Sequence, residues 1–464
     1  MSTTQTPSTR GAGPLDGGKG RPFGSPPASL VTEHGYLMEE FLLDGTAQAY
    51  SPAAGSTIGV DGRWTVEPAA TATYRTRMYV VRPEDPARFN GVVLVNWQNV
   101  TAGFDLGAPG IHDLAQGYSW VGVTVQQMAV EGRPSLAPSM PAIAGLAAWD
   151  PDRYGSLHHP GDEFSYDMFT QAARTMAADR PLDGVDPLGG LQPQLFLATG
   201  ESQSAMRLGT YINMVDDDER LFDAYFLNLH WGVCTHPPNQ SLSDSFAPIG
   251  NGLSAGSAAI HDRGRVPILV LNTESETLRC FAVRQPDTAT YRFWEMAGTA
   301  HMGGDVVPRM RATITRDGIT TSPQLDGINN IDWAYVRNAA LEQLVAWAEG
   351  GTPAPSFPPI EVENGTIVTD EIGNATGGIR LPDLAVPTAV HSSTNATSAA
   401  AALAGQSTPL TDEQLSALYP DADAYLTAWN GAVDTIRAQG LVLTSDLDDV
   451  RARGRTIAAA LWSS

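Results

Sequence analysis

The chain of 464 residues contains only two cysteines, Cys234 and Cys280, and neither belongs to a spacing typical of zinc ligands. A structural metal is therefore not expected, and no other cofactor is predicted. The two thiols are expected either to pair with each other or to remain reduced in the core. The sequence leaves both possibilities open.

Positive charge is also scarce, since 28 Lys and Arg residues stand against 51 Asp and Glu residues, for a net charge of −23. The basic residues form no cluster, which makes nucleic acids and anionic membrane surfaces poor partners. A neutral or apolar small molecule suits this charge better than an anionic one. An acidic surface that only aids solubility is the preferred explanation of this balance.

The sequence lacks any apolar run long enough to cross a membrane. Residues 1–27 are rich in Gly, Pro, Ser and Thr and contain no hydrophobic segment of the kind found in secretory signals. We therefore expect residues 1–30 to be a disordered lead-in, and we expect the protein to be cytoplasmic.

The most informative stretch is Leu195-Phe-Leu-Ala-Thr-Gly-Glu-Ser-Gln-Ser204. Its apolar start is typical of a buried strand, and helical spacing of apolar residues follows Ser202. A serine at such a sharp turn projects its hydroxyl from the sheet, where the backbone N–H of Gln203 can stabilise an oxyanion. The turn requires small residues two positions before and after the serine, and Gly200 and Ser204 meet that requirement. Ser202 is therefore a candidate nucleophile.

Around this turn, apolar runs alternate with helical patterns, which predicts an α/β fold with a doubly wound, mostly parallel sheet. An opening strand pair is expected within residues 36–50. Further strands are expected at residues 73–82, 91–97, 120–125, 195–198, 224–228, 266–271 and 291–296. Helices are expected at residues 111–116, at 166–178, after Ser202, and at 332–349.

The main domain is expected to span residues 31–351. Within it, residues 230–265 form a long polar segment rich in Gly, Pro and Ser, which is a candidate lid. Residues 352–464 differ in character and are expected to form a C-terminal extension that packs on the core. Thr411 and Gln414 predict a capping box at the start of a helix in this extension, and residues 421–439 and 446–461 also look helical.

A nucleophilic serine needs a general base, and the base needs an orienting acid. His301 follows the last predicted strand and is the expected base, with His391 as a weaker rival. The acid is expected in the loop after the strand at residues 266–271. Glu276 is preferred there, because a loop can return toward the strand ends at that distance, and Glu274 is the second choice.

The second oxyanion donor is expected from the loop that follows the strand at residues 91–97. The N–H of Gln98 or of Asn99 is the candidate, and Trp97 could line the substrate pocket with an apolar wall. Glu201, next to the nucleophile, is interpreted as a structural or hydrogen-bonding residue and not as the acid.

These motifs resemble the α/β-hydrolase superfamily, and more narrowly a bacterial subgroup known only as "alpha/beta hydrolase domain-containing" proteins. The similar segments are Gly200-Glu-Ser-Gln-Ser204, Thr273-Glu-Ser-Glu276, Arg284-Gln-Pro-Asp287 and Trp294-Glu-Met-Ala-Gly-Thr-Ala-His301. The resemblance implies the α/β-hydrolase fold and a triad of Ser202, Glu276 and His301. The subgroup often has Asp where Glu276 stands, so Glu274 stays open as the acid.

The predicted function is hydrolysis of a carboxylic ester through an acyl-enzyme, in which His301 takes the proton of Ser202. An acyltransferase, a lactone or amide hydrolase, and a non-catalytic ligand-binding protein on the same fold are the alternatives. Trp97, His230 and Trp231 indicate a neutral, fairly apolar, medium-sized substrate, although plain core packing would explain these residues as well. A homo-oligomer is left open.

Overall fold

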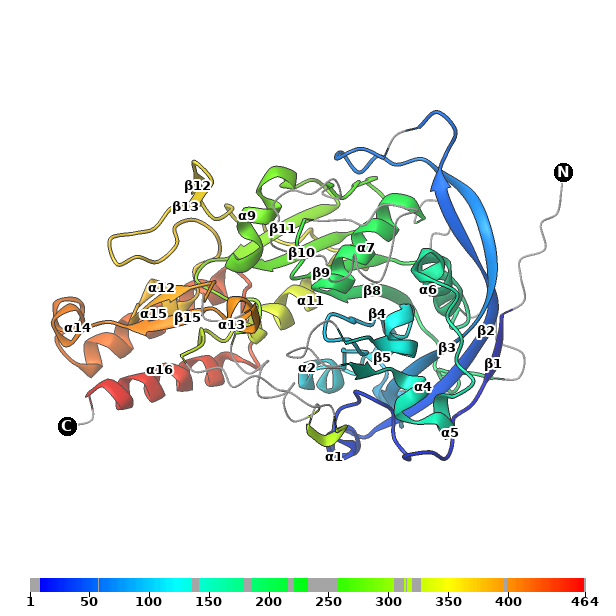
Figure 1. Cartoon of the computed structure of the whole chain (residues 1–464). Coiled ribbons are helices and arrows are strands. Elements are labelled where there is room, and N and C mark those ends of the chain that lie inside the picture. The colour runs from blue at the N-terminus through cyan, green and yellow to red at the C-terminus, as the bar shows by residue number, and fades with distance from the viewer. Residues whose placement is uncertain are drawn as a thin grey trace. The chain divides into compact units, whose positions relative to one another are not determined.

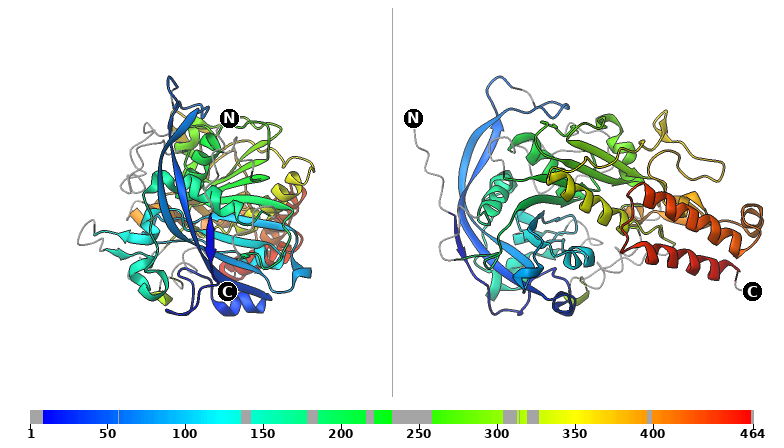
Figure 2. Two further views of the ribbon diagram at one scale, coloured as in Figure 1. Left: turned by 90° about the vertical axis from the view of Figure 1, so that its right-hand side faces the viewer. Right: turned by 180° about the vertical axis from the view of Figure 1, so that it is seen from behind.

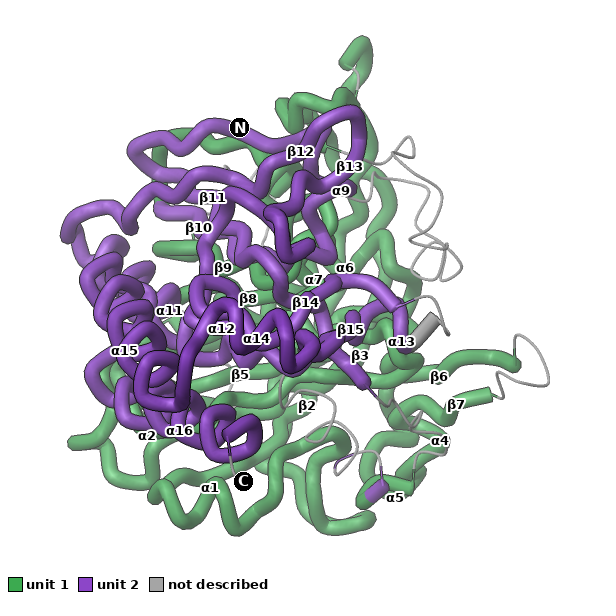
Figure 3. The backbone as a smooth tube through the Cα atoms, turned by 90° about the vertical axis from the view of Figure 1, so that its left-hand side faces the viewer, with its two compact units in different colours: residues 1–266, 316–319 green, residues 267–315, 320–464 purple. Residues whose placement is uncertain are grey.

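The computed structural model describes residues 9–56, 58–135, 142–177, 185–215, 221–232, 258–303, 313, 315–318, 327–395 and 399–462. The chain divides into two compact units, which Figure 3 colours green and purple. Unit 1 comprises residues 1–266 and 316–319, and unit 2 comprises residues 267–315 and 320–464. Each unit is described by itself.

The sheet of unit 1 has antiparallel strands on one side and parallel strands on the other. Its strands lie in the order β1 (Arg10–Ala12), β2 (Tyr36–Pro52), β3 (Val66–Pro83), β5 (Ser119–Val123), β4 (Val92–Trp97), β8 (Leu195–Glu201) and β9 (Ala224–Asn228). Pairing is antiparallel from β1 as far as β5 and parallel from β5 to β9.

The antiparallel side is dominated by β2 and β3, two long strands that Figures 1 and 2 show as a curved blue ribbon. They pair from Tyr36↔Pro83 to Pro52↔Val66, with an irregularity between Gln48 and Tyr50. The prediction of a strand pair within residues 36–50 is therefore wrong, because this segment is one continuous strand. The strand expected at residues 73–82 is confirmed as part of β3.

The parallel strands β4, β5, β8 and β9 are almost entirely buried, as expected of strands covered on both faces. Helix α6 (Ser165–Arg174) packs Phe169 against Trp97 of β4, with ring centroids 5.0 Å apart. Helix α7 (Gln203–Met214) packs Tyr211 against Tyr225 of β9 at 6.5 Å. These aromatic contacts join the helices to the sheet.

The remaining helices and strands of unit 1 are short. They are α1 (Ala28–Glu33), η1 (Pro86–Arg88), α2 (Ile111–Ala115), α3 (Gln127–Glu131), β6 (Gly132–Arg133), β7 (Ile143–Ala144), α4 (Leu146–Trp149), α5 (Pro151–Tyr154) and η2 (Asp162–Phe164). Strands β6 and β7 pair with each other in antiparallel fashion.

Residues 10–30, which composition predicted to be a disordered lead-in, are ordered in the structure. Besides strand β1 and the start of α1, they hold an ion pair between Arg21 and Asp317 at 3.0 Å. The backbone N–H of Gly24 donates to the same carboxylate at 3.0 Å, and Phe23 is buried against Trp149. A few anchoring contacts outweigh the low hydrophobicity of this segment.

Unit 2 contains a parallel pair of strands, β10 (Ile268–Thr273) and β11 (Tyr291–Met296), and the long helix α11 (Ala334–Ala348). Three short helical turns follow β10, namely η3 (Glu274–Glu276), α9 (Thr277–Cys280) and η4 (Phe281–Val283). Parallel strands alternate with helices in both units, so the predicted α/β fold with a mostly parallel sheet is confirmed.

The rest of unit 2 comprises the residues expected to form an extension. Its elements are β12 (Val362–Glu363), β13 (Thr366–Ile367), α12 (Pro382–Ala385), β14 (Ala389–Ser392), α13 (Ala399–Ala404), β15 (Gln406–Pro409), α14 (Asp412–Leu418), α15 (Ala422–Ala438) and α16 (Leu447–Trp462). The capping box of Thr411 and Gln414 is confirmed at the start of α14. Trp429 of α15 donates from Nε1 to the carbonyl of Val450 on α16 at 3.0 Å.

The residues after position 352 contact β11 within unit 2. The N–H of Ile379 donates to the carbonyl of Glu295 at 2.7 Å, and the N–H of Ala297 donates to the carbonyl of Ile379 at 3.0 Å. Trp294 donates from Nε1 to the carbonyl of Pro355 at 2.8 Å. The extension thus continues the backbone hydrogen bonding of β11 beyond its end.

Part of the candidate lid, residues 233–257, lies outside the described residues, and so does Cys234. Cys280 is buried, and Nδ2 of Asn272 donates to its Sγ at 3.3 Å. Within the described part of the chain, none of the helices has the length and apolar character that a bilayer-spanning segment requires.

Candidate active site

Ser202 occupies a strained turn between β8 and α7. Its φ is 58° and its ψ is −119°, a backbone conformation that residues other than glycine rarely adopt. A Cβ on Gly200 would lie 2.8 Å from the carbonyl oxygen of Ser204, so glycine is required there. Ser204 fits because its hydroxyl donates to the carbonyl of Glu201 at 2.8 Å. The sharp turn expected from the sequence is present.

The surroundings of Ser202 come from β9 and α7. Its N–H donates to the carbonyl of Asn228 at 2.9 Å, and Nε1 of Trp231 lies 3.4 Å from its Oγ. Gln203 is the first residue of α7, so no carbonyl of that helix can accept its N–H. The positive end of the helix dipole also lies there, which favours negative charge beside Ser202.

In the loop after β4, both N–H groups predicted as the second oxyanion donor are hydrogen-bonded to backbone carbonyls. The N–H of Gln98 donates to the carbonyl of Val123 at 3.3 Å, and the N–H of Asn99 donates to the carbonyl of Leu106 at 2.9 Å. Both groups are therefore engaged in holding the loop. The next N–H along the chain, that of Val100, donates to the side-chain Oε1 of Gln203 at 3.5 Å. This is the longest of the three hydrogen bonds, which makes Val100 the better candidate.

The side chain of Asn99 joins this loop to the turn. Its Nδ2 donates to the carbonyl of Glu201 at 2.7 Å, and its Oδ1 accepts from the N–H of Thr101 at 2.8 Å. Asn99 therefore holds the backbone on either side of Val100 in a fixed position next to the residue that precedes Ser202.

Two other residues singled out near the turn have structural contacts. Trp97 is fully buried, packs on α6 and donates from Nε1 to Oε1 of Gln126 at 3.1 Å, so it belongs to the core. Glu201 accepts from Nδ2 of Asn228 at 3.2 Å, which agrees with its interpretation as a hydrogen-bonding residue.

In unit 2, His301 and Glu276 lie in contact. Nδ1 of His301 is 2.7 Å from Oε1 of Glu276, and both side chains are buried. The other carboxylate oxygen, Oε2, accepts from the N–H and the hydroxyl of Thr273 at 2.8 and 2.6 Å. Because the carboxylate only accepts hydrogen bonds, it favours the tautomer that carries the proton on Nδ1 and leaves the lone pair on Nε2.

Glu274, the second choice for the acid, points elsewhere. Its Oε2 accepts from the N–H of Gly298 at 2.6 Å. Burial raises the pKa of Glu274, although hydrogen bonds from Gly298 and Ser393 partly oppose that effect. Of the two candidate carboxylates, Glu276 is the one that contacts the histidine.

Sequence reasoning missed Ser275, which lies between the two glutamates. The N–H of His301 donates to Oγ of Ser275 at 3.0 Å, and that hydroxyl donates to the carbonyl of Ser393 at 3.0 Å. The N–H of Met302 also donates to the carbonyl of Leu403 at 2.8 Å. Residues of the extension therefore hold the loop that carries His301.

His391, the weaker rival for the base, and the histidines that precede the acid in the chain have other surroundings. Nδ1 of His391 lies 2.9 Å from Oγ of Ser407, and burial lowers the pKa of His391 to about 4. Nε2 of His159 is 2.9 Å from the carbonyl of Val125. Burial lowers the pKa of His230 to about 4, so this residue is neutral near pH 7. His236 lies outside the described residues.

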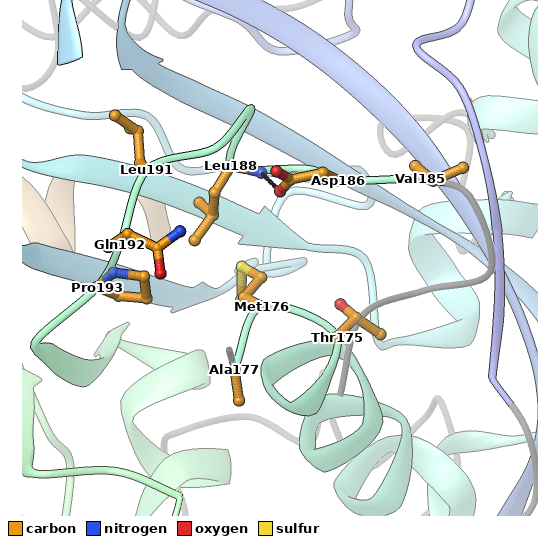
Figure 4. A pocket seen from close by; sticks show the side chains of 9 residues that line it. All are labelled: Thr175, Met176, Ala177, Val185, Asp186, Leu188, Leu191, Gln192 and Pro193. Atoms are coloured by element: carbon orange, nitrogen blue, oxygen red, sulfur yellow. Dashed lines mark hydrogen bonds between the residues drawn. The ribbon is translucent and has the colours of Figure 1, made fainter. Parts of the chain in front are cut away.

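A cavity of about 130 Å³ in unit 1 is lined by residues 175–177 and by residues between 185 and 193 (Figure 4). Residues 191–193 of this lining lead directly into β8, whereas Ser202 follows it, so that part of the lining and the nucleophile candidate lie at opposite ends of the strand. Among the described residues, no group of three or more His, Cys, Asp and Glu side chains could hold a metal ion.

Comparison with known protein families gives one match that spans almost the whole chain. A family described as "Alpha/beta hydrolase domain" matches residues 10–452. No curated protein matches the sequence.

The solved structures that match this chain include three esterases. An esterase of the hyperthermophilic archaeon Pyrobaculum calidifontis is 16% identical over 57% of this chain and 77% of its own, with a TM-score of 0.27. An arylesterase is 11% identical over 53% and 79%, with a TM-score of 0.26. The esterase Est22 is 13% identical over 63% and 80%, with a TM-score of 0.28.

Proposed function

Because the chain belongs to the family of alpha/beta hydrolase domains, we propose that it is a serine hydrolase that cleaves carboxylic esters through an acyl-enzyme. The observation that carries this proposal is the strained turn at Ser202, beside the first N–H of α7, which has no acceptor within that helix. The contact between His301 and Glu276 supports it independently.

In the proposed reaction, Nε2 of His301 takes the proton of Ser202 as Oγ attacks the ester carbonyl. Glu276 stabilises the imidazolium that forms. The N–H groups of Gln203 and Val100 donate to the oxyanion. The protonated His301 then gives its proton to the leaving alcohol, and water releases the acyl group by the same steps in reverse order.

The proposed substrate is neutral and fairly apolar. The net charge of −23 disfavours anionic esters. His230, two residues beyond β9, is buried and uncharged near pH 7, and Trp231 beside Ser202 is an apolar aromatic surface. The cytoplasmic location and the bacterial subgroup remain predictions from the sequence.

The test combines labelling with kinetics. A fluorophosphonate probe should label Ser202, as identified by peptide mass spectrometry, and Ser202→Ala should lower kcat for an aryl ester by at least about 10³-fold. Ser165→Ala is the matched control, because this buried hydroxyl has no partner among the described side chains and lies outside the proposed machinery. Wild-type activity in Ser202→Ala would contradict the proposal.

The same experiment separates the alternatives. A wild-type protein that neither reacts with the probe nor turns over esters would favour a ligand-binding protein. Adding a competing alcohol and analysing the products would distinguish hydrolysis from acyl transfer, since both proceed from one acyl-enzyme.

A further inference from the structure

Trp231 contacts the proposed nucleophile directly. Its indole Nε1 lies 3.4 Å from Oγ of Ser202, and both residues are buried, with 3% and 8% of their surface exposed. The separation is long for a hydrogen bond, but such contacts at catalytic groups often shorten when substrate binds.

The backbone around Trp231 resembles the turn at the nucleophile. Glu201 at the end of β8 pairs with Asn228 at the end of β9. The residue that follows each strand, Ser202 after β8 and Leu229 after β9, has a φ of 58°. Two neighbouring parallel strands are therefore each followed by a non-glycine residue with a positive φ.

Leu229 is the more unusual of the two, because a leucine in this region gains nothing from its side chain that would offset the strain. Such strain persists where the surrounding structure enforces it, often at functional sites. Here the turn at Leu229 directs the chain so that Trp231, two residues later, reaches Oγ of Ser202.

The chemistry of the indole makes this contact directional. Its N–H can only donate, so Oγ of Ser202 must accept and its own proton must point to another group. A donor at Oγ also stabilises negative charge on that oxygen.

We propose that Trp231 is a further catalytic residue, whose indole N–H orients the hydroxyl of Ser202 and stabilises Oγ when it leaves the acyl group. This inference rests on the proposed serine-hydrolase function.

The effect of the Trp231 N–H differs between acylation and deacylation. In acylation, Oγ forms a bond to the carbonyl carbon while its proton passes to His301, so negative charge leaves Oγ. In deacylation, the bond between carbon and Oγ breaks, the electron pair returns to Oγ, and His301 returns the proton. Trp231 should therefore assist deacylation more than substrate binding.

The test is Trp231→Phe, which keeps an aromatic ring and removes the N–H. Pre-steady-state kinetics with a nitrophenyl ester separate the acylation burst from the deacylation rate. We expect deacylation to slow about tenfold, while the acylation rate and kcat/KM change less. Trp64→Phe is the matched control, because Trp64 is buried in the same unit and donates from Nε1 to the carbonyl of Gly59 at 2.7 Å.

Replacing Trp231 by benzothienylalanine, which has the shape of tryptophan but no N–H, covers the case in which Trp231→Phe does not fold. Deacylation at the wild-type rate in the isostere would overturn the inference, as would a change confined to KM. These outcomes can be distinguished from a failure of the proposed serine-hydrolase function. In that case Ser202→Ala would keep wild-type activity.

Discussion

The N–H of His301 donates to Oγ of Ser275 at 3.0 Å, and the same hydroxyl donates to the carbonyl of Ser393. One serine thus connects the loop of the proposed base to the C-terminal residues of unit 2. The extension therefore helps to hold the loop of the proposed base in position.

Ser275→Ala should lower kcat about tenfold with little change in KM, because the His301 loop loses one anchor while Trp231 and the proposed oxyanion donors are unchanged. The measurement is steady-state kinetics with an aryl ester. Ser416→Ala is the control, since it removes a hydroxyl bonded to the carbonyl of Asp412 on the exposed helix α14. Equal kcat in both variants would show that Ser275 does not position His301.

The two buried glutamates should respond differently to the loss of charge. Glu276→Gln should lower kcat about 10³-fold, because an amide in place of the carboxylate no longer stabilises the imidazolium of His301. Glu274→Gln should keep kcat within a few-fold, since Oε1 of glutamine can still accept from the N–H of Gly298. A larger loss in Glu274→Gln than in Glu276→Gln would reverse the assignment of the acid.

The strands of the parallel sheet could be predicted because their apolar runs are unbroken. Strands β9 and β11 have the predicted bounds. The antiparallel strand β2 was harder to predict, since Asp44-Gly45 is a typical hairpin signal. In the structure Asp44 and Gly45 pair with Arg75 and Tyr74 inside one long strand, so tertiary pairing overrides the local preference for a turn.

The sequence also contains a pattern that identifies Glu276 of the candidate site. Thr273-Glu-Ser-Glu276 has the spacing of a capping box, and the structure shows one there, with Oε2 of Glu276 on Thr273. That spacing could have separated Glu276 from Glu274. The oxyanion donors could not be read in this way, because any residue can supply a backbone N–H and only the fold decides which is free.

Asn99→Asp should lower kcat about tenfold, because a carboxylate cannot donate to the carbonyl of Glu201 and the loop with the Val100 N–H loses its link to the turn. Asn90→Asp is the matched control. Nδ2 of Asn90 likewise donates to a carbonyl, that of Gln116, and its Oδ1 accepts from the N–H of Val92. If both variants lose activity equally, Asn99 has only a general structural role.

Lowering the pH should reduce the free energy of unfolding of unit 2, because His391 is buried there. Burial lowers its pKa to about 4 from 6.5, an effect that nearby Asp383 opposes and Arg453 reinforces. Between pH 6.5 and 4 the unfolded chain binds a proton at this position and the folded chain does not. Stability therefore falls as pH falls through this window, by up to about 3 kcal/mol, and is unaffected by His391 above pH 6.5.

His391→Gln should remove this contribution, because glutamine does not titrate and can still hydrogen bond to Oγ of Ser407. Thermal denaturation of both proteins from pH 4 to 8 measures the effect, with the variant expected to lose less stability below pH 6.5. His230 is buried with a similarly low pKa, so part of the acid sensitivity should persist in the variant. Parallel curves for the two proteins over the whole range would mean that His391 is protonated in the folded chain as readily as in the unfolded one.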